Sequence, residues 1–185
     1  MKLLEKDKSG NKLIKKKVKI GILGGTFDPA HKGHLAISDL AKKKFFLKYI
    51  IWAITKKNPF KGKSISSLKE RIKFAKDITS SKKFIRIRFY ENKIKSNKTI
   101  DLINYLKKDK SLEINFIIGA DNLINFHKWH KWKIISQKCN ILVFDRQGYK
   151  AKSQKSTTFR RLNGKSLKFI SFKKVNISSS QLRKI

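Results

Sequence analysis

The chain has 185 residues, with 47 Lys and Arg against 12 Asp and Glu, a formal net charge of +35 and one cysteine. This length suits a single domain with a hydrophobic core, and no apolar run reaches the roughly 18 residues that a membrane helix needs. The lysine-rich N-terminus lacks the apolar stretch of a signal peptide, and a lone cysteine excludes an internal disulfide. We therefore expect a cytoplasmic protein with no membrane partner, in which Cys139 is a buried structural thiol.

The high positive charge has two interpretations. It could form a face that binds nucleic acid, or it could be a generally basic, solvated surface. Lysines are spread along the whole chain, with triplets only at residues 15–17 and 42–44. This distribution favours the second interpretation, so we expect no dedicated nucleic-acid partner. A basic nucleic-acid-binding protein is kept as the alternative from another class of function.

In chain order, short β-rich runs alternate with helical patterns, which is typical of a parallel sheet with helices on its faces. Residues 1–17 are predicted to be a basic N-terminal extension, and residues 18–185 a single α/β domain. Predicted strands are residues 18–23, 49–54, 84–89, 114–118, 141–144 and 169–172. Predicted helices are residues 31–45, 67–78, 99–106 and a stretch within 122–137, with a short helix near Ser178. Residues 147–166 are predicted to form a long loop.

The most informative stretch runs from Gly21 to His34 and reads G-I-L-G-G-T-F-D-P-A-H-K-G-H. Its glycines let the backbone approach a ligand closely. Asp28 is predicted to cap the following helix, and Pro29 to occupy its first position. His31 and His34 are three residues apart, so they share one face of the first helical turn. A strand end, a tight turn and a helix N-terminus together predict a phosphate site.

Two common nucleotide-binding patterns are absent. The first predicted strand ends in G-I-L-G-G, which is not the G-x-G-x-x-G of dinucleotide-binding folds. The G-K-S runs at 62–64 and 164–166 lack the earlier glycine of a P-loop. Residues 58–61, 119–121 and the stretch before Ser178 each follow a predicted strand. Because ligands bind beyond the carboxyl ends of such strands, we expect these segments to share one site.

The remaining pattern, G-G-T-F-D-P-x-H-x-G-H, resembles the nucleotidyltransferases that share H-x-G-H with class I aminoacyl-tRNA synthetases. Within that group, the motif is most similar to that of the nicotinate-nucleotide adenylyltransferases. Further matches follow in family order: N-P-F-K at 58–61 and then Arg71, G-A-D-N-L at 119–123 with Trp129, D-R-Q-G-Y at 145–149, and I-S-S-S-Q-L-R at 177–183. The resemblance implies a single-domain, Rossmann-like, doubly wound parallel sheet of the H-x-G-H type.

The resemblance also implies a reaction, namely transfer of AMP from ATP to nicotinate mononucleotide. The products would be nicotinate adenine dinucleotide and pyrophosphate, a step of NAD biosynthesis. His34 would donate to the α-phosphate and His31 would orient ATP. The implied ATP-binding residues are Gly24, Gly25, Thr26, Phe27, His31, His34, Lys61, Ile177, Ser179, Ser180 and Arg183. The implied nicotinate-mononucleotide-binding residues are Thr99, Asp121, Trp129 and His130.

Mg²⁺ should accompany ATP, held by phosphates and water, and no metal site made by the protein is expected. In particular, His127 and His130 are not expected to bind zinc, because no cysteine or acidic cluster lies beside them. The sequence is compatible with either a monomer or a homo-oligomer. The alternative enzyme is a sister adenylyltransferase that acts on phosphopantetheine.

Four residues also admit a structural interpretation. Asp121 fits the N-cap of a helix equally well. Either Trp129 or Trp132 could belong to the core, and only the resemblance selects the first as a stacking ring. Arg71 is predicted to make a structural ion pair.

Overall fold

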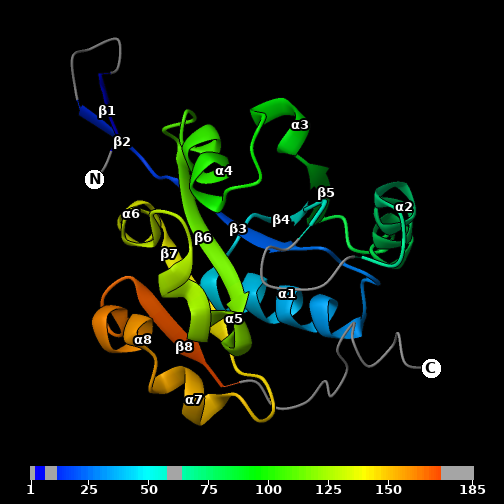
Figure 1. Ribbon diagram of the computed structural model, residues 1–185. Coiled ribbons are helices and arrows are strands. Elements are labelled where there is room, and N and C mark those ends of the chain that lie inside the picture. Colours follow the sequence, from blue (N-terminus) through cyan, green and yellow to red (C-terminus); the bar gives the residue numbers. More distant parts are fainter. Residues whose placement is uncertain (1–2, 7–11, 58–63, 172–185) are drawn as a thin grey trace.

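A six-stranded parallel sheet forms the centre of the computed structural model, which describes residues 3–6, 12–57 and 64–171, with side chains from Lys16 onward (Figure 1). Its spatial order is β5-β4-β3-β6-β7-β8. These strands are β3 (Val18–Gly25), β4 (Tyr49–Ile54), β5 (Ile85–Phe89), β6 (Leu112–Gly119), β7 (Asn140–Phe144) and β8 (Leu167–Ile170). Before them, β1 (Leu3–Lys6) and β2 (Lys12–Lys15) pair as a small antiparallel sheet.

One or more helices lie between most consecutive strands of the parallel sheet. They are α1 (Lys32–Phe45), α2 (Leu68–Ile78), α3 (Glu91–Ile94), α4 (Thr99–Leu106), α5 (Ala120–Asn125), the 3₁₀ turn η1 (Phe126–Lys128), α6 (Trp132–Lys138), α7 (Lys150–Gln154) and α8 (Thr157–Leu162). Among the described helices, none combines the length and hydropathy needed to cross a bilayer.

The direction of winding changes between β3 and β6. From β3 the chain builds outward through β4 to β5, and it then returns to β6 on the other side of β3. The two central strands are paired in parallel from Val18–Leu112 to Leu23–Ile117. In doubly wound sheets a ligand binds at this switch point, beyond the carboxyl ends of the strands. The segments that follow β3 and β6 therefore lie where a nucleotide would bind.

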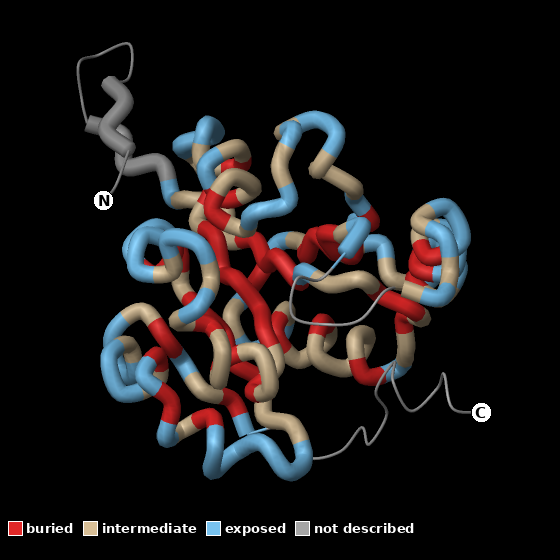
Figure 2. The backbone as a smooth tube through the Cα atoms, viewed as in Figure 1, coloured by how far each residue is buried: buried red, intermediate tan, exposed pale blue. Residues whose placement is uncertain are grey.

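The central strands are apolar on both faces, which explains their near-continuous hydrophobic runs. One core cluster contains Ile20 and Ile22 of β3 and packs under α4, α5 and α6. The other contains Trp52 and Leu142 and packs under α1 and α2. Figure 2 shows this burial pattern, with buried strands at the centre and exposed outer surfaces on the helices.

Most of the predicted elements are confirmed, and their ends shift by at most two residues. The stretch within 122–137 is divided into α5, η1 and α6. The predicted long loop at 147–166 is wrong, because it contains α7 and α8. There, the Oγ of Ser156 accepts a bond from the N–H of Phe159, whose ring contacts Phe169 at 6.0 Å between centroids. The cap and the packing of Phe159 and Leu162 against the core stabilise α8, which is too short to show a helical periodicity.

Candidate active site

The last two residues of β3, Gly24 and Gly25, leave room for a ligand beside the backbone. A Cβ built on Gly24 would meet only the ring of Phe116, at 3.9 Å, so packing does not demand glycine there. A Cβ on Gly25 would meet only the Phe27 ring, at 3.5 Å or more. The N–H of Thr55, just past β4, donates to the carbonyl of Gly25 at 3.0 Å. This bond ties the ends of two neighbouring strands together at the switch-point edge.

The helix after this turn starts differently from the prediction. Its N-cap is His31, whose Nδ1 accepts a bond from the N–H of Gly33 at 3.1 Å. The predicted cap, Asp28, is instead buried, and its carboxylate accepts from the N–H groups of Ile65 at 2.8 Å and Ser66 at 3.2 Å. Pro29 lies in the preceding turn, after a cis peptide bond, and not at the first helical position. The carboxylate is used to hold a distant segment, so the histidine provides the cap.

His31 and His34 lie together, as their spacing predicts, with ring centroids 3.8 Å apart. The Nδ1 of His34 accepts from the backbone N–H of His31 at 3.2 Å. In each neutral ring, therefore, Nδ1 is the acceptor and Nε2 carries the proton. The first turn of α1, immediately after the glycine turn, therefore carries two rings whose N–H donor is at Nε2.

Phe27 holds the turn in a left-handed conformation, with φ at 51°. Such a backbone costs a non-glycine residue of order 1 kcal/mol and persists where its surroundings fix it. Its ring stacks on Trp52 at 4.9 Å between centroids and contacts His34 at 4.8 Å. The indole of Trp52 donates to the Oγ of Ser38, which donates to the carbonyl of His34. The catalytic histidine candidate and the turn thus share one packed cluster.

Arg71 is a structural residue, but its contacts are not the predicted ion pair. Its guanidinium donates to the carbonyls of Thr26 (2.6 Å), Thr55 (2.9 Å), Lys56 (3.3 Å) and Ser66 (3.2 Å). Burial lowers the pKa of Arg71, while the charges of Asp28 and Glu91 oppose that shift. A guanidinium stays charged at any ordinary pH, so a buried cation lies beside the turn.

At the end of β6, Asp121 makes an ion pair with Arg146. Its carboxylate accepts from Nη1 of Arg146 at 2.7 Å, across the ends of β6 and β7. The interpretation of Asp121 as a helix N-cap is wrong, since Gly119 caps α5. A Cβ on Gly119 would meet the Asp121 carboxylate, so a larger residue there would displace that carboxylate. The sequence motif singled out Asp121 but gave no sign of its partner, which lies 25 residues away.

The remaining predicted acceptor-binding residues lie on elements around β6. Trp129 follows η1 and packs edge-on to Phe116, with centroids 6.0 Å apart. Trp132 begins α6, and both indoles are partly buried against the same core, so burial does not separate them. Thr99 is the first residue of α4, and His130 is exposed. Lys61, Ile177, Ser179, Ser180, Arg183 and the predicted helix near Ser178 lie outside the described residues.

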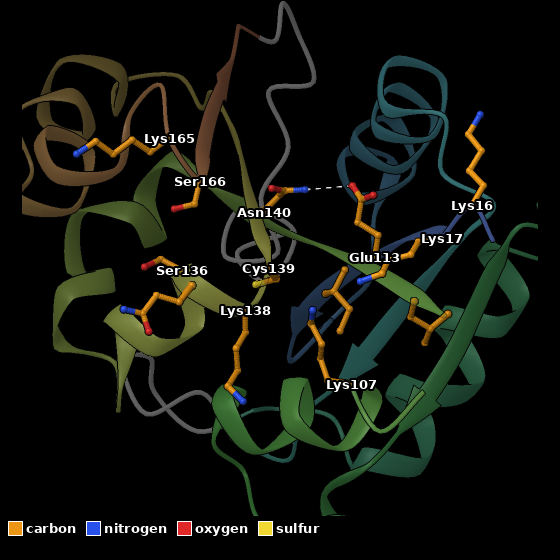
Figure 3. Close-up of a pocket in the computed structure, with 13 residues that line it drawn as sticks. Lys16, Lys17, Lys107, Glu113, Ser136, Lys138, Cys139, Asn140, Lys165 and Ser166 are labelled. Carbon is orange, nitrogen blue, oxygen red and sulfur yellow. Dashed lines mark hydrogen bonds between the residues drawn. The ribbon is translucent and has the colours of Figure 1, made fainter. Parts of the chain in front are cut away.

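A separate basic pocket lies at the amino ends of strands β6 and β7, opposite the candidate site at their carboxyl ends (Figure 3). Lys107, Lys138 and Lys165 line it, together with Glu113 and Asn140 near the starts of β6 and β7. Two of these lysines lie at the C-terminal ends of α4 and α6, where a cation offsets the helix dipole. None of the predicted substrate-binding residues lines this pocket, so it is separate from the candidate site.

Cys139, on the same side as this pocket, has no chemical role in the candidate site. Its side chain is buried, and its thiol donates to the carbonyl of Ile135 at 3.2 Å. Burial raises the pKa of the Cys139 thiol to about 12. The prediction of a buried structural thiol is confirmed.

Three comparisons relate the chain to known proteins. A cytidylyltransferase-like family model matches residues 22–185. A "probable nicotinate-nucleotide adenylyltransferase" of Pelagibacter ubique is 70% identical over 178 residues, covering 96% of this chain and 99% of the relative. One from Bradyrhizobium (strain ORS 278) is 39% identical over 131 residues, covering 70% and 68%.

Among solved structures, nicotinic acid mononucleotide adenylyltransferase of Plasmodium falciparum, complexed with NaAD, matches with a TM-score of 0.74 and 20% identity. The match covers 90% of this chain and 82% of that one, and it shows the shared fold. The sequence relatives and the family model together confirm the resemblance drawn from the motifs. The chain belongs to the nicotinate-nucleotide adenylyltransferase family.

Proposed function

We propose that this protein transfers the AMP moiety of ATP to nicotinate mononucleotide, releasing pyrophosphate and forming nicotinate adenine dinucleotide. The observation that carries the proposal is the pair of imidazoles, 3.8 Å apart, at the start of α1. They follow the glycine turn that ends β3, next to the switch point with β6. Family membership identifies the nucleotide acceptor among the substrates that such a site could use.

The reaction requires alignment and charge stabilisation. The 5′-phosphate of the acceptor attacks the α-phosphorus of ATP, so two anions must approach each other as negative charge builds on the α-phosphate oxygens. A positioned donor at such an oxygen is typically worth about 3–4 kcal/mol in the barrier. His34 supplies that donor from Nε2, and His31 orients the ATP from the same face. Neither residue forms a covalent intermediate in this scheme.

The backbone from Gly24 to Phe27 binds the ATP phosphates and ribose in this proposal. The N–H groups of Thr26 and Phe27 make no hydrogen bond to another described residue, which supports a role in ligand binding. Lys61, Ile177, Ser179, Ser180 and Arg183 complete the triphosphate site by their match to the family motifs. Ser and Arg side chains at such positions suit phosphate oxygens.

The acceptor occupies the side formed by β6 and β7. Trp129 stacks on the pyridine ring, backbone amides near Thr99 and His130 receive the nicotinate carboxylate, and Asp121 contacts the ribose or organises the pocket. The ion pair between Asp121 and Arg146 supports the organising role, because it fixes the carboxylate direction. Backbone donors favour a carboxylate over the amide of nicotinamide mononucleotide, which presents an NH₂.

Mg²⁺ enters with ATP in this proposal. Among the residues that the structure describes, no group of three His, Cys, Asp or Glu could hold a metal ion. On a nucleotide, Mg²⁺ usually takes phosphate oxygens and water as its ligands. When bound, the ion neutralises part of the triphosphate charge. We also propose a cytoplasmic location, in keeping with the free thiol of Cys139.

The test is turnover of ATP with nicotinate mononucleotide, followed as pyrophosphate release. His34→Ala should lose the activity, while Lys43→Ala, an exposed change on the same helix, should keep it. Parallel reactions with nicotinamide mononucleotide and with phosphopantetheine test the acceptor. Turnover of phosphopantetheine alone, or salt-sensitive nucleic-acid binding without any turnover, would contradict the proposal.

A further inference from the structure

Three segments that are distant in sequence converge on the side chain of Arg71. Its Nη1 bonds the Thr26 carbonyl in the turn after β3 and the Thr55 carbonyl after β4. Its Nη2 and Nε bond carbonyls of Lys56 and Ser66, which lie on either side of residues 58–63. A guanidinium has five N–H donors in a fixed fork, and here four carbonyls accept from it. The side chain is 3% exposed, so water competes little for these bonds.

The start of α2 directs Arg71 toward these carbonyls. Ser67 and Glu70 form a reciprocal capping box, in which the Ser67 Oγ accepts from the Glu70 N–H and the Glu70 carboxylate accepts from the Ser67 N–H. This box fixes the first turn of α2. Arg71 lies four residues after the N-cap, about one helical turn along. Its own N–H bonds the Ser67 carbonyl at 3.1 Å. The local sequence of α2 thus sets the backbone position of Arg71, and the four carbonyls hold its guanidinium.

The bond to the Thr26 carbonyl has a consequence for the next N–H. In a trans peptide the C=O and the following N–H point in opposite directions. Since the Thr26 carbonyl points toward Arg71, the N–H of Phe27 points away from it. That N–H makes no hydrogen bond within the described part of the chain. The left-handed backbone of Phe27, with φ at 51°, also needs its flanking peptides to be held.

We propose that Arg71 is a positioning residue for nucleotide binding: by holding the Thr26 carbonyl, it directs the Phe27 N–H toward the phosphates of ATP. The inference rests on the proposed function, because it takes the turn at residues 24–27 to be the phosphate-binding turn. Arg71 touches no substrate in this scheme. It acts through the peptide that joins Thr26 to Phe27, and its effect belongs to the ATP side of the site alone.

The test compares Arg71→Gln and Arg71→Lys with Lys73→Gln, an exposed change on the same helix that removes the same charge. Initial rates are measured with each substrate varied in turn, and thermal unfolding checks the fold. Arg71→Gln should raise the KM for ATP by about tenfold or more, the effect expected from losing one charge-assisted hydrogen bond. The KM for nicotinate mononucleotide should not change. Arg71→Lys should restore part of the ATP affinity, since an ammonium can still reach one carbonyl.

A role in stability alone would give a different result. A smaller folded fraction lowers kcat and leaves both KM values unchanged, and that result in folded Arg71→Gln would overturn the proposal. If Arg71→Gln does not fold, Arg71→Lys decides in the same way. Calorimetric binding of a non-hydrolysable ATP analogue, without acceptor, separates the two hypotheses. Suppose that Arg71→Gln binds the analogue more weakly than the wild type does, and that the wild type shows no turnover. This result would contradict the proposed reaction but would support the role of Arg71.

Discussion

The Nδ1 of His34 accepts a hydrogen bond from the backbone N–H of His31 at 3.2 Å, so the bond that starts α1 also fixes the proposed catalytic ring. The ring is further packed against Phe27 and Trp52. This contact assigns two separate tasks to one imidazole. Nδ1 serves the helix, and Nε2 is the nitrogen that can donate to substrate.

The two tasks of His34 can be separated by substitution. His34→Asn can keep an acceptor for the His31 N–H but loses the Nε2 donor, so kcat should fall by about 10²–10³. The unfolding midpoint should change little. His34→Ala should lose the same activity and in addition about 1 kcal/mol of stability, because the helix start loses a capping bond. Pyrophosphate release and urea unfolding measure the two effects. Full activity in His34→Asn would show that the Nε2 donor is not needed.

Asp28 should contribute to stability through the two N–H groups that it accepts. Asp28→Asn retains only one acceptor oxygen for the bonds to Ile65 and Ser66, and its new NH₂ is buried among donors. We expect a loss of about 1–3 kcal/mol in the free energy of unfolding, measured by urea titration. Asp77→Asn, an exposed change in α2, is the control and should have almost no effect. Equal stability of the two variants would mean that the Asp28 bonds add nothing to the fold.

Trp129 and Trp132 provide a matched pair for the acceptor site. Trp129→Leu should raise the KM for nicotinate mononucleotide by roughly tenfold and leave the KM for ATP unchanged, because aromatic stacking is worth about 0.5–1.5 kcal/mol. Trp132→Leu should lower stability through lost packing on Phe126, with both KM values unchanged. Steady-state kinetics with each substrate varied distinguishes these outcomes. A raised acceptor KM in Trp132→Leu alone would reverse the two assignments.

The thiol of Cys139 should be unreactive in the folded protein. Burial raises its pKa from 9.0 to about 12, so below that pH the folded chain keeps the neutral thiol. The thiol of an unfolded chain ionises above about pH 9, so this group's contribution to stability is present below pH 9 and is lost as pH rises toward 12. Iodoacetamide at pH 9 should therefore label the protein in urea far faster than the native protein. Equally fast labelling of both would contradict the burial.

A Cys139→Ala variant supplies the control for the pH dependence. Its stability should fall less steeply between pH 9 and 12 than that of the wild type, since the shared lysine titrations cancel in the comparison. Identical slopes would show that the thiol does not take part.

The sequence by itself determined the alternation of strands and helices, the parallel sheet and the histidine pair. These features are local: apolar runs of strand length identify buried parallel strands, and a spacing of three residues places two side chains on one helical face. The H-x-G-H pattern and the later motifs also predicted the family. Helices α7 and α8 were not predicted because helices of five and six residues are too short to show an apolar periodicity.

Only the tertiary structure decided how the polar groups are used. Asp28 has the sequence position of a helix cap, yet its carboxylate binds the backbone before α2, and His31 caps α1 instead. Arg71 was expected to find one acidic partner, and it binds four carbonyls from three segments. A buried polar group bonds whatever the fold brings within reach, because leaving it unpaired costs more than any local preference supplies. Such partners depend on how the strands are ordered in space, which no local pattern records.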